Sequence, residues 1–470
     1  DPTTGAFARA GTALTNGKVS FWWDSIGQEP ARPPLPGSTQ ADVCIVGAGY
    51  TGLWTAYYLK KAAPQLRIVV LEQRFAGFGA SGRNGGWLTN EITGGRGSYL
   101  KSHGREAVGR QQTAMNETVD EVIRVTRDEN IECDVVKGGE FTVATNAAQQ
   151  TRLVHAVEEA HSWPMTDVEL LSAAEATARI NVRGTTGAMW HPHCARLHPA
   201  KLAAGLARVV ESLGVEIYEQ TRVSEIRPHE AVTAAGTVTA ETVVRATEGF
   251  TAQIDGLRRT WLPMNSSLIV TEPLSPEIWA DIGWGGYETL GDQAHAYMYA
   301  QRTADDRIAI GGRGAPYRYG SGTDVDGATD PKTVGLLRDI LVRFFPATAG
   351  AAVEHVWSGV LGVPRDWSAT VGLDTSTGLG WAGGYVGTGV TSTNLAGRTL
   401  RDLILKSPSA LTELPWVNHR VRKWEPEPLR YIAVQAMYKA YYAADRAELR
   451  GRATTSPIAT AADLVSGRGH

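Results

Sequence analysis

ADVCIVGAGYTGLWTAYYLKKAAPQLRIVVLEQR, running from Ala41 to Arg74, is the stretch that decides the fold. The continuous apolar run from Asp42 to Val46 is typical of a strand buried on both faces of a parallel sheet. After a glycine turn, Tyr50 to Lys61 predicts a helix, and Arg67 to Leu71 predicts the next parallel strand. This order of strand, turn, helix and strand predicts a Rossmann-like α/β fold.

The turn GAGYTG uses each of its glycines for a different purpose. Gly47 permits the tight turn, Gly49 lets a pyrophosphate approach the backbone, and Gly52 lets the helix pack closely on the strand. The helix N-terminus offers free amides and a positive dipole end to phosphates. Glu72, twenty residues after Gly52, lies where an acid would accept the ribose hydroxyls of an adenosine. The sequence therefore predicts a dinucleotide site.

A second glycine-rich loop, GFGASGRNGGW from Gly77 to Trp87, follows within a few residues of this acid. A nicotinamide-dependent enzyme would normally continue into an ordinary helix at this point. Successive small residues expose backbone N–H groups, which can surround the phosphates and ring edge of a bulkier cofactor.

These two segments resemble the flavin-dependent amine oxidoreductases of the D-amino-acid oxidase and sarcosine oxidase superfamily, and most closely its gamma-glutamylputrescine oxidase-like branch. The lead-in Ser20 to Pro30 and the segment Arg196 to Ile226 are similar to that branch as well. The resemblance implies an FAD-binding domain of the glutathione reductase-like, D-amino-acid oxidase type, with an inserted, mixed and largely antiparallel β-sheet domain for the substrate. It also implies that Ser81 to Gly86 lie along the flavin and that Val223 contacts the adenine.

A third glycine turn lies in GLGWAGGYVGTGVTSTNLAGRTLRDLI, from Gly378 to Ile404. A helix that begins near Thr388 could stabilise the negative charge of a reduced flavin. The motif and the resemblance together predict these FAD contacts: Gly47, Gly49, Tyr50, Thr51, Gly52, Glu72, Gln73, Gly79, Ala80, Ser81, Arg83, Asn84, Gly85, Gly86, Trp87, Val223, Gly249, Gly384, Gly387, Thr388, Gly389, Val390 and Thr391.

The segment VWSGVLGVPRDWSATVG, from Val356 to Gly372, resembles the part of the family that lies beside the flavin. Where glycine oxidase-like members carry an arginine that holds the substrate carboxylate, this chain has Leu361. This difference favours an amine without that carboxylate, unless Arg313 or Arg318 replaces the arginine. Sarcosine oxidases link the flavin covalently to a cysteine near the position of Gly359. None of the three cysteines of this chain lies near that position, so we expect FAD to bind noncovalently. The predicted substrate pocket comprises Trp357, Leu361, Tyr297, Tyr299, Arg313, Tyr385 and Trp261.

The resemblance implies oxidation of an amine C–N bond by hydride transfer to flavin N5, with hydrolysis of the imine and O₂ as acceptor, giving hydrogen peroxide. No catalytic side chain is assigned, because the flavin carries the chemistry. Two alternatives stay open. One is a dehydrogenase that passes electrons to a quinone or carrier protein, and the other is a noncatalytic flavin-binding subunit.

Bulk properties exclude several other classes of protein. The 470 residues carry a net charge of −3, so no basic field exists to hold a nucleic acid. Three widely spaced cysteines and the lack of an apolar run of membrane length favour a soluble, cytoplasmic monomer or homodimer. HPHCARLH, from His191 to His198, could bind zinc, but an irregular structural loop is the preferred interpretation, so no metal is predicted.

The predicted domains follow from these assignments. Residues 1–37 form a lead-in; 38–105, 186–260 and 354–415 form the FAD domain; 106–185 and 261–353 form the substrate domain; and 416–470 form a C-terminal extension. Apolar side chains at helical spacing from Tyr431 to Tyr441 predict a helix docked on the body. Beyond Thr454 the composition predicts a loosely held end, and Val243 to Phe250 predicts one further parallel strand.

Overall fold

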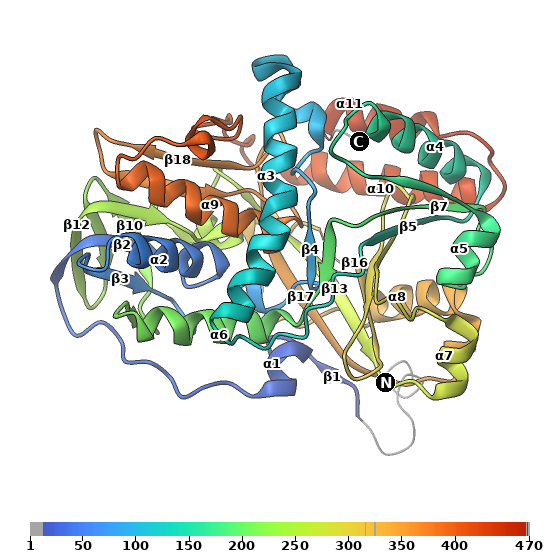
Figure 1. Ribbon diagram of the computed structural model, residues 1–470, viewed down its shortest axis with the longest axis horizontal. Helices are drawn as coiled ribbons and strands as arrows, with labels where there is room; N and C mark the ends of the chain where they lie inside the picture. Colours follow the sequence, from blue (N-terminus) through green and yellow to red (C-terminus); the bar gives the residue numbers. More distant parts are fainter. Residues whose placement is uncertain (1–12, 315, 324–325, 467, 469–470) are drawn as a thin grey trace.

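The computed structural model describes residues 13–314, 316–323, 326–466 and 468. Two large sheets lie next to each other, and helices cover both (Figure 1). The predicted fold class is confirmed: one sheet is mainly parallel and the other mainly antiparallel.

The eight-stranded sheet contains the first glycine turn. Its main path runs β10-β11-β12-β2-β3-β9, with β19 beside β12 and β18 beside β19. Five of these strands, β19, β12, β2, β3 and β9, run parallel to their neighbours. The bounds are β2 Thr39–Val46, β3 Ile68–Leu71, β9 Glu216–Tyr218, β10 Val223–Arg227, β11 Glu230–Thr233, β12 Gly236–Arg245, β18 Thr370–Asp374 and β19 Leu379–Gly383.

Four helices pack around this sheet: α2 (Tyr50–Ala62), α3 (Leu100–Asp128), α6 (Pro199–Ser212) and α9 (Gly389–Ile404). They share one large apolar cluster with the sheet, which includes Leu53, Trp54, Val122, Leu206 and Leu395. The predicted strand from Val243 to Phe250 is wrong in extent. β12 ends at Arg245, and a 3-10 segment, η3 (Glu248–Gln253), takes over, because the chain turns there along the end of the sheet.

The nine-stranded sheet has the order β1-β17-β13-β16-β15-β14-β5-β7-β6. Its neighbours are antiparallel except for the pairs β1·β17 and β14·β5. The bounds are β1 Thr15–Asn16, β5 Glu140–Ala144, β6 Glu169–Ser172, β7 Gly187–His191, β13 Leu262–Thr271, β14 Thr289–Asp292, β15 Tyr299–Arg302, β16 Ile308–Arg313 and β17 Val353–Val363. Helices α4 (Ala147–His161), α5 (Ala173–Arg179), α7 (Pro276–Ile282) and α8 (Pro331–Phe344) surround it.

Two strands of this sheet come from ranges that the sequence assigned to the FAD domain: β7 and β17. β17 pairs along its length with β13, from Val353 to Val363. A short third sheet, β4 (Trp87–Thr89) with β8 (Cys194–Arg196), lies between the FAD-binding loops and α6 in the chain order. The exact division into domains stays a prediction.

The first and last described helices pack against the rest of the protein. The N-terminal helix α1 (Phe21–Ile26) buries Trp22 and Trp23 in the large cluster. The C-terminal extension forms α10 (Leu429–Leu449) as predicted, and Figure 1 shows it beside α4. The prediction of a loose end beyond Thr454 is wrong, because Pro457–Ser466 forms α11, which packs Ala459 into an apolar cluster with α10.

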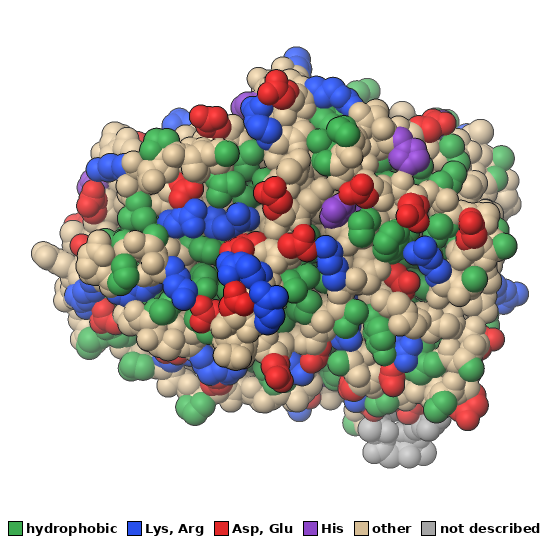
Figure 2. Space-filling view, in the orientation of Figure 1, with side chains coloured by type: hydrophobic (Ala, Val, Ile, Leu, Met, Phe, Trp, Pro, Cys, Tyr) green, Lys and Arg blue, Asp and Glu red, His purple; other side chains and the backbone are tan. Residues whose placement is uncertain are grey.

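The molecular surface carries both signs of charge. Figure 2 shows Lys and Arg side chains interspersed with Asp and Glu side chains on the face that it presents. In the described part of the chain, no helix combines the length and the apolar character needed to span a bilayer.

Candidate functional site

A cavity lies where the three glycine-rich segments meet. It encloses about 1330 Å³ of space free of protein atoms, its opening to solvent included. Residues from positions 46–51, 71–84, 221–223, 246–254, 360–361 and 385–393 line it, together with Thr323. Most of these segments were predicted from the sequence to contact FAD. The predicted residues that line it are Gly47, Gly49, Tyr50, Thr51, Glu72, Gln73, Gly79, Ala80, Ser81, Asn84, Val223, Gly249, Leu361, Tyr385, Gly387, Gly389 and Val390.

The first glycine turn has little space for side chains. Gly47 has a φ of +109°, and a Cβ there would lie 2.3 Å from the carbonyl oxygen of Ala246. At Gly52 a Cβ would lie 1.9 Å from the carbonyl oxygen of Gly47, so this residue lets α2 start directly against the turn. The N-cap residue of α2, Gly49, has no side chain that could cap the helix. The turn and the start of α2 therefore form a close cradle of backbone groups.

Glu72, at the end of β3, ties this turn in place. Its carboxylate accepts hydrogen bonds from the backbone N–H groups of Ala48 at 2.9 Å and Arg74 at 3.0 Å. Burial raises the pKa of Glu72 above its ordinary value. The acid lines the cavity on the same side as Gln73 and Val223, where the sequence predicted the adenosine.

The second loop divides into two parts with different surroundings. Gly79, Ala80, Ser81 and Asn84 line the cavity, and the Ser81 hydroxyl accepts the N–H of Tyr50 at 2.8 Å, so the two loops touch. Gly85 and Gly86 instead let the loop approach the nine-stranded sheet. A Cβ at Gly85 would lie 2.8 Å from the ring of Tyr299, and one at Gly86 would lie 2.1 Å from the amide of Gln301.

Arg83 and Trp357 connect this loop to β17 and do not line the cavity. The Arg83 guanidinium donates to the carbonyl oxygens of Phe78 and Ser358, at 2.8 and 3.2 Å. The indole of Trp357 donates to the carbonyl oxygen of Arg83 at 2.8 Å and is fully buried. These hydrogen bonds go to protein backbone, and the two side chains also pack on aromatic neighbours: Arg83 lies 4.5 Å from the ring centre of Phe78, and Trp357 packs edge-on against Trp22.

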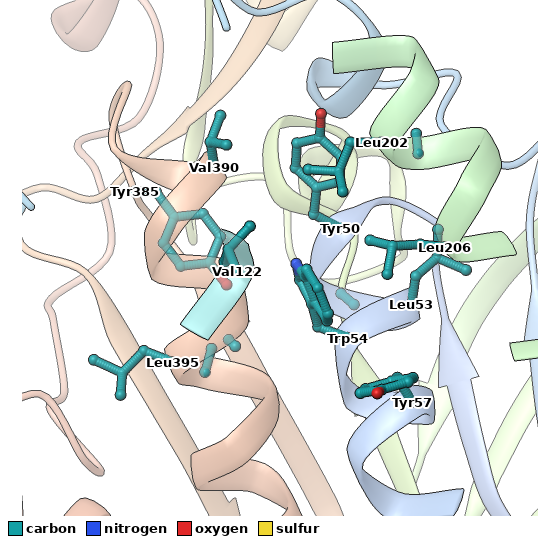
Figure 3. Packing of buried hydrophobic residues seen from close by; sticks show 14 of the residues in the cluster. Tyr50, Leu53, Trp54, Tyr57, Val122, Leu202, Leu206, Tyr385, Val390 and Leu395 are labelled. Atoms are coloured by element: carbon teal, nitrogen blue, oxygen red, sulfur yellow. The ribbon is translucent and has the colours of Figure 1, made fainter. Parts of the chain in front are cut away.

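The third glycine turn leads into α9. Gly387 has a φ of +93°, and no atom lies within 4 Å of a Cβ built there, so it faces open space. The hydroxyl of Tyr385 lies 2.8 Å from that of Thr51, and Figure 3 shows Tyr385 and Val390 on the α9 side, across from Tyr50 and Trp54 of α2. The N-cap residue of α9, Thr388, makes no side-chain capping hydrogen bond, and neither does Gly49 at α2. Two helix N-termini thus belong to segments that line one cavity.

Besides Arg83, seven predicted FAD contacts are absent from the lining: Gly52, Gly85, Gly86, Trp87, Gly384, Thr388 and Thr391. Of these, Thr391 is fully buried in α9. The hydroxyl of Thr388 lies 2.6 Å from that of Thr93, and the N–H of Gly384 donates to Glu248 at 2.9 Å. These residues shape the walls, and their assignment as direct contacts stays a prediction.

In the η3 segment the sequence predicted only Gly249, and it missed Glu248, Phe250 and Gln253, which also line the cavity. The Glu248 carboxylate accepts the N–H groups of Gly384 at 2.9 Å and Tyr385 at 3.0 Å. Burial raises the pKa of Glu248 to about 7. Glu248 in the segment ATEGF could have indicated a cavity residue, but the sequence pattern assigned it to a parallel strand.

Of the residues predicted to form the substrate pocket, some line the cavity and others do not. Leu361 and Tyr385 line the cavity. Trp261 is buried beneath the guanidinium of Arg245, 4.7 Å from its ring centre. Tyr299 packs on Trp87 and its hydroxyl meets that of Ser266 at 2.9 Å, whereas Tyr297 is 47% exposed.

The His-rich segment is not the predicted irregular loop. It forms the ends of β7 and β8, and its four candidate ligands have separate partners. His191 meets Glu140, His193 meets Asp167, Cys194 meets Thr289, and His198 caps α6. Strand pairing, which the spacing of the histidines did not reveal, separates these side chains.

Comparison with known proteins agrees with this architecture. The sequence profile of the family described as FAD dependent oxidoreductase matches residues 42–403. The chain belongs to this family. The oxidoreductase is 31% identical over 397 residues to the gamma-glutamylputrescine oxidoreductase of Escherichia coli, covering 83% of this chain and 90% of that one. It is 28% identical over 403 residues to the probable oxidoreductase OrdL of Haemophilus influenzae, covering 84% and 89%.

Among solved structures, the fold resembles glycine oxidase from Geobacillus kaustophilus, with a TM-score of 0.66 at 22% identity, over 82% of this chain and 99% of that one. The protein is therefore an FAD-dependent oxidoreductase, and its cavity can be tested for fit to FAD. Glu72 can accept hydrogen bonds from ribose hydroxyls, the N-termini of α2 and α9 can hold anionic groups, and Gly387 leaves open space for a ring. The residues present fit this cofactor.

Proposed function

We propose that this oxidoreductase oxidises the C–N bond of an amine that lacks an α-carboxylate. The observation that carries the proposal is Leu361, an aliphatic side chain that lines the cavity where the family resemblance implies a carboxylate-binding arginine. A carboxylate buried against leucine would lose its hydration without gaining a charged partner, which is costly. The relative named gamma-glutamylputrescine oxidoreductase supports an amine substrate class.

Neither of the two arginines considered as replacements supports binding of an α-carboxylate. The guanidinium of Arg313 donates to the carbonyl oxygens of Ala296 and Gly312, both at 2.8 Å. Arg318 is exposed, and neither residue belongs to the lining of the cavity. The pocket therefore favours an amine recognised through apolar and aromatic contacts.

The first two glycine loops and Glu72 would hold the dinucleotide part of FAD, and the turn before α9 would hold the ring. When bound, FAD supplies the hydride acceptor for the C–N bond. The binding is noncovalent, because Cys44, Cys133 and Cys194, all in the described part of the chain, lie outside the lining of the cavity. Leu361 and Tyr385 exclude water from the side on which the amine enters, and thereby favour the neutral, reactive form of the amine.

We further infer that O₂ accepts the electrons. In the balanced reaction, the amine, O₂ and water give an aldehyde or ketone, ammonia or a shorter amine, and hydrogen peroxide. A quinone or carrier protein as acceptor is the alternative outcome, in which O₂ uptake would be negligible while an artificial dye still supported turnover.

Anaerobic mixing of the yellow holoenzyme with a panel of amines and α-amino acids tests the proposal. We expect bleaching of the flavin absorbance by amines, followed by O₂ uptake and peroxide formation when air is admitted. Bleaching by α-amino acids alone would contradict the assignment of Leu361 as a selector against the carboxylate.

A further inference from the structure

The C-terminal extension lies outside the residues that match the family profile, yet it packs beside the substrate side of the cavity. α10 contributes Val434, Met437 and Tyr441 to a buried cluster that also contains Met264 and Trp367. The partly buried side chains of Leu361 and Val386 pack against this cluster. Val386 lies between Tyr385 and Gly387, both of which line the cavity. The extension and the cavity therefore share a wall.

One face of β17 connects the two regions. Trp357, Leu361 and Val363 are spaced by even numbers of residues, so their side chains point to the same face of the strand. Trp357 lies in the large cluster of the FAD side, Leu361 lines the cavity, and Val363 lies in the cluster with α10. Beyond Leu361 on this face, the side chains of the strand therefore pack against those of the extension.

A cation already occupies a group of aromatic rings in this region. The guanidinium carbon of Arg468 lies 4.8 Å from the ring centre of Tyr441, 5.4 Å from that of Tyr297 and 5.9 Å from that of Trp367. We call these three rings the aromatic cage. They come from α10, from the loop before β15 and from the turn after β17, so the tertiary fold alone assembles them. Rings at such distances attract a cation through their negative faces.

The cage is also polarised towards positive charge. The hydroxyl of Tyr441 donates a hydrogen bond to the carboxylate of Asp463 on α11. Burial lowers the pKa of Arg468, but Tyr297, Tyr438, Tyr441 and Asp463 outweigh it, so the net direction is upward. Within the described part of the chain, no side-chain hydrogen bond is found for the Arg468 guanidinium, which is held by the three rings and by the nearby charge of Asp463. A ligand cation could replace it without breaking a hydrogen bond of the guanidinium.

We propose that the aromatic cage is the subsite for a second, positively charged group on the amine substrate, and that the Arg468 side chain stands in for that group. This inference rests on the proposed amine oxidation. It narrows the substrate class to diamines and polyamines, in which the reacting nitrogen lies near Leu361 and the distal ammonium lies in the cage. Leu361 provides an apolar surface for the methylene chain between them.

Matched substrates isolate the charge. The holoenzyme is tested with primary amines H₂N–(CH₂)n–N(CH₃)₃⁺ of increasing chain length, each paired with its neutral isostere H₂N–(CH₂)n–C(CH₃)₃. We expect the cationic member to have an about tenfold higher kcat/KM at the best length, from cation–π attraction in a partly desolvated cage. A higher kcat/KM for the neutral member at every length would overturn the proposal.

Three variants test the residues. Tyr297→Leu should remove most of the cationic advantage, and Tyr319→Leu is its matched control, because Tyr319 is another exposed tyrosine that stacks on Tyr431 outside the cage. Arg468→Ala should raise kcat/KM for the cationic amine about threefold by removing the competing side chain, and should leave the neutral isostere unchanged. Equal effects of Tyr297→Leu on both members of a pair would overturn the proposal.

Binding provides a readout that is independent of turnover. Isothermal titration of the holoenzyme with an alkyltrimethylammonium ion, which cannot be oxidised as an amine, should give tighter binding to Arg468→Ala and weaker binding to Tyr297→Leu. If no amine of either kind bleaches the flavin, the proposed function fails. If neutral amines bleach it and the ammonium ion binds all variants equally, amine oxidation stands and the cage proposal fails.

Discussion

Glu248→Gln changes the charge of a carboxylate inside the cavity and leaves the size of the side chain almost unchanged. Glu248 lines the cavity and accepts the N–H groups of Gly384 and Tyr385, which belong to the turn before α9. The substitution therefore tests whether the charge at this position is as poorly solvated as the structure indicates.

The size of the effect follows from the pKa. Burial raises the pKa of Glu248 from 4.5 to about 7, so between these pH values the folded protein holds a proton that the unfolded chain has released. The free energy of unfolding of the wild type then falls by about 1.4 kcal/mol per pH unit as the pH rises, or about 3 kcal/mol over the window. Glutamine does not titrate. Its single acceptor oxygen leaves one N–H without a partner, which is a pH-independent cost of about 1–3 kcal/mol.

Urea unfolding of the wild type and of Glu248→Gln, followed by tryptophan fluorescence between pH 4.5 and pH 8.5, measures the difference. Other titrating groups cancel, because the two proteins share them. We expect the wild type to lose about 3 kcal/mol relative to the variant between pH 4.5 and pH 7, and no further change above about pH 7.5. Arg245→Met should enlarge the effect, since the charge of Arg245 lowers the pKa of Glu248. A difference that is constant with pH would refute the reasoning.

Three further predictions concern the turn, the pocket and the extension. Gly52→Ala should lower the free energy of unfolding by about 1–3 kcal/mol and weaken FAD binding, because its Cβ would collide with the carbonyl oxygen of Gly47. The control Gly335→Ala, which adds a Cβ in open space on α8, should do neither. Thermal melts and FAD titration measure both variants. Leu361→Arg should shift flavin bleaching from amines towards α-amino acids, and Leu361→Met should not; unchanged selectivity in the arginine variant would contradict the role of position 361. Burial alone would raise the pKa of Glu448, but hydrogen bonds from His295 and Arg152 lower it to about 2. The carboxylate therefore stabilises α10 by about 3 kcal/mol above pH 4.5, and this stabilisation is lost as the pH falls towards 2. Glu448→Gln should expose α10 to proteolysis at neutral pH, and equal resistance of the two proteins would count against this pairing.

The cofactor cradle was the part of the site most accessible from the sequence. Gly47 and Gly52 act through steric limits of the turn itself, and a Cβ at Gly52 would meet an atom only five residues away in the chain. Such short-range constraints are visible as a spacing of residues. The position of Leu361 could be recognised for a similar reason, since it stands within a continuous segment that resembles the family.

Other features depend on residues that are far apart in the chain. Glu248 meets the N–H of Gly384 across 136 positions, and no local pattern shows that a buried acid holds the third turn. Trp357 and Arg83 look like site residues in sequence, but they bond to each other's segments across 274 positions and contact backbone. The four candidate ligands of the His-rich segment separate because strand pairing gives each a different neighbour.

The sequence by itself determined the FAD-binding turn and the succession of parallel strands and helices, because these follow from the size of a glycine and from the periodicity of adjacent side chains. The role expected of Leu361 came from the family resemblance of its segment. Only the tertiary structure decided which acid lies in the cavity, which aromatic rings gather around a cation, and that the C-terminal extension packs beside the pocket. Those arrangements come from packing between segments that lie far apart in the chain, 136 positions in the case of Glu248 and Gly384, and burial and charge act only once the segments meet.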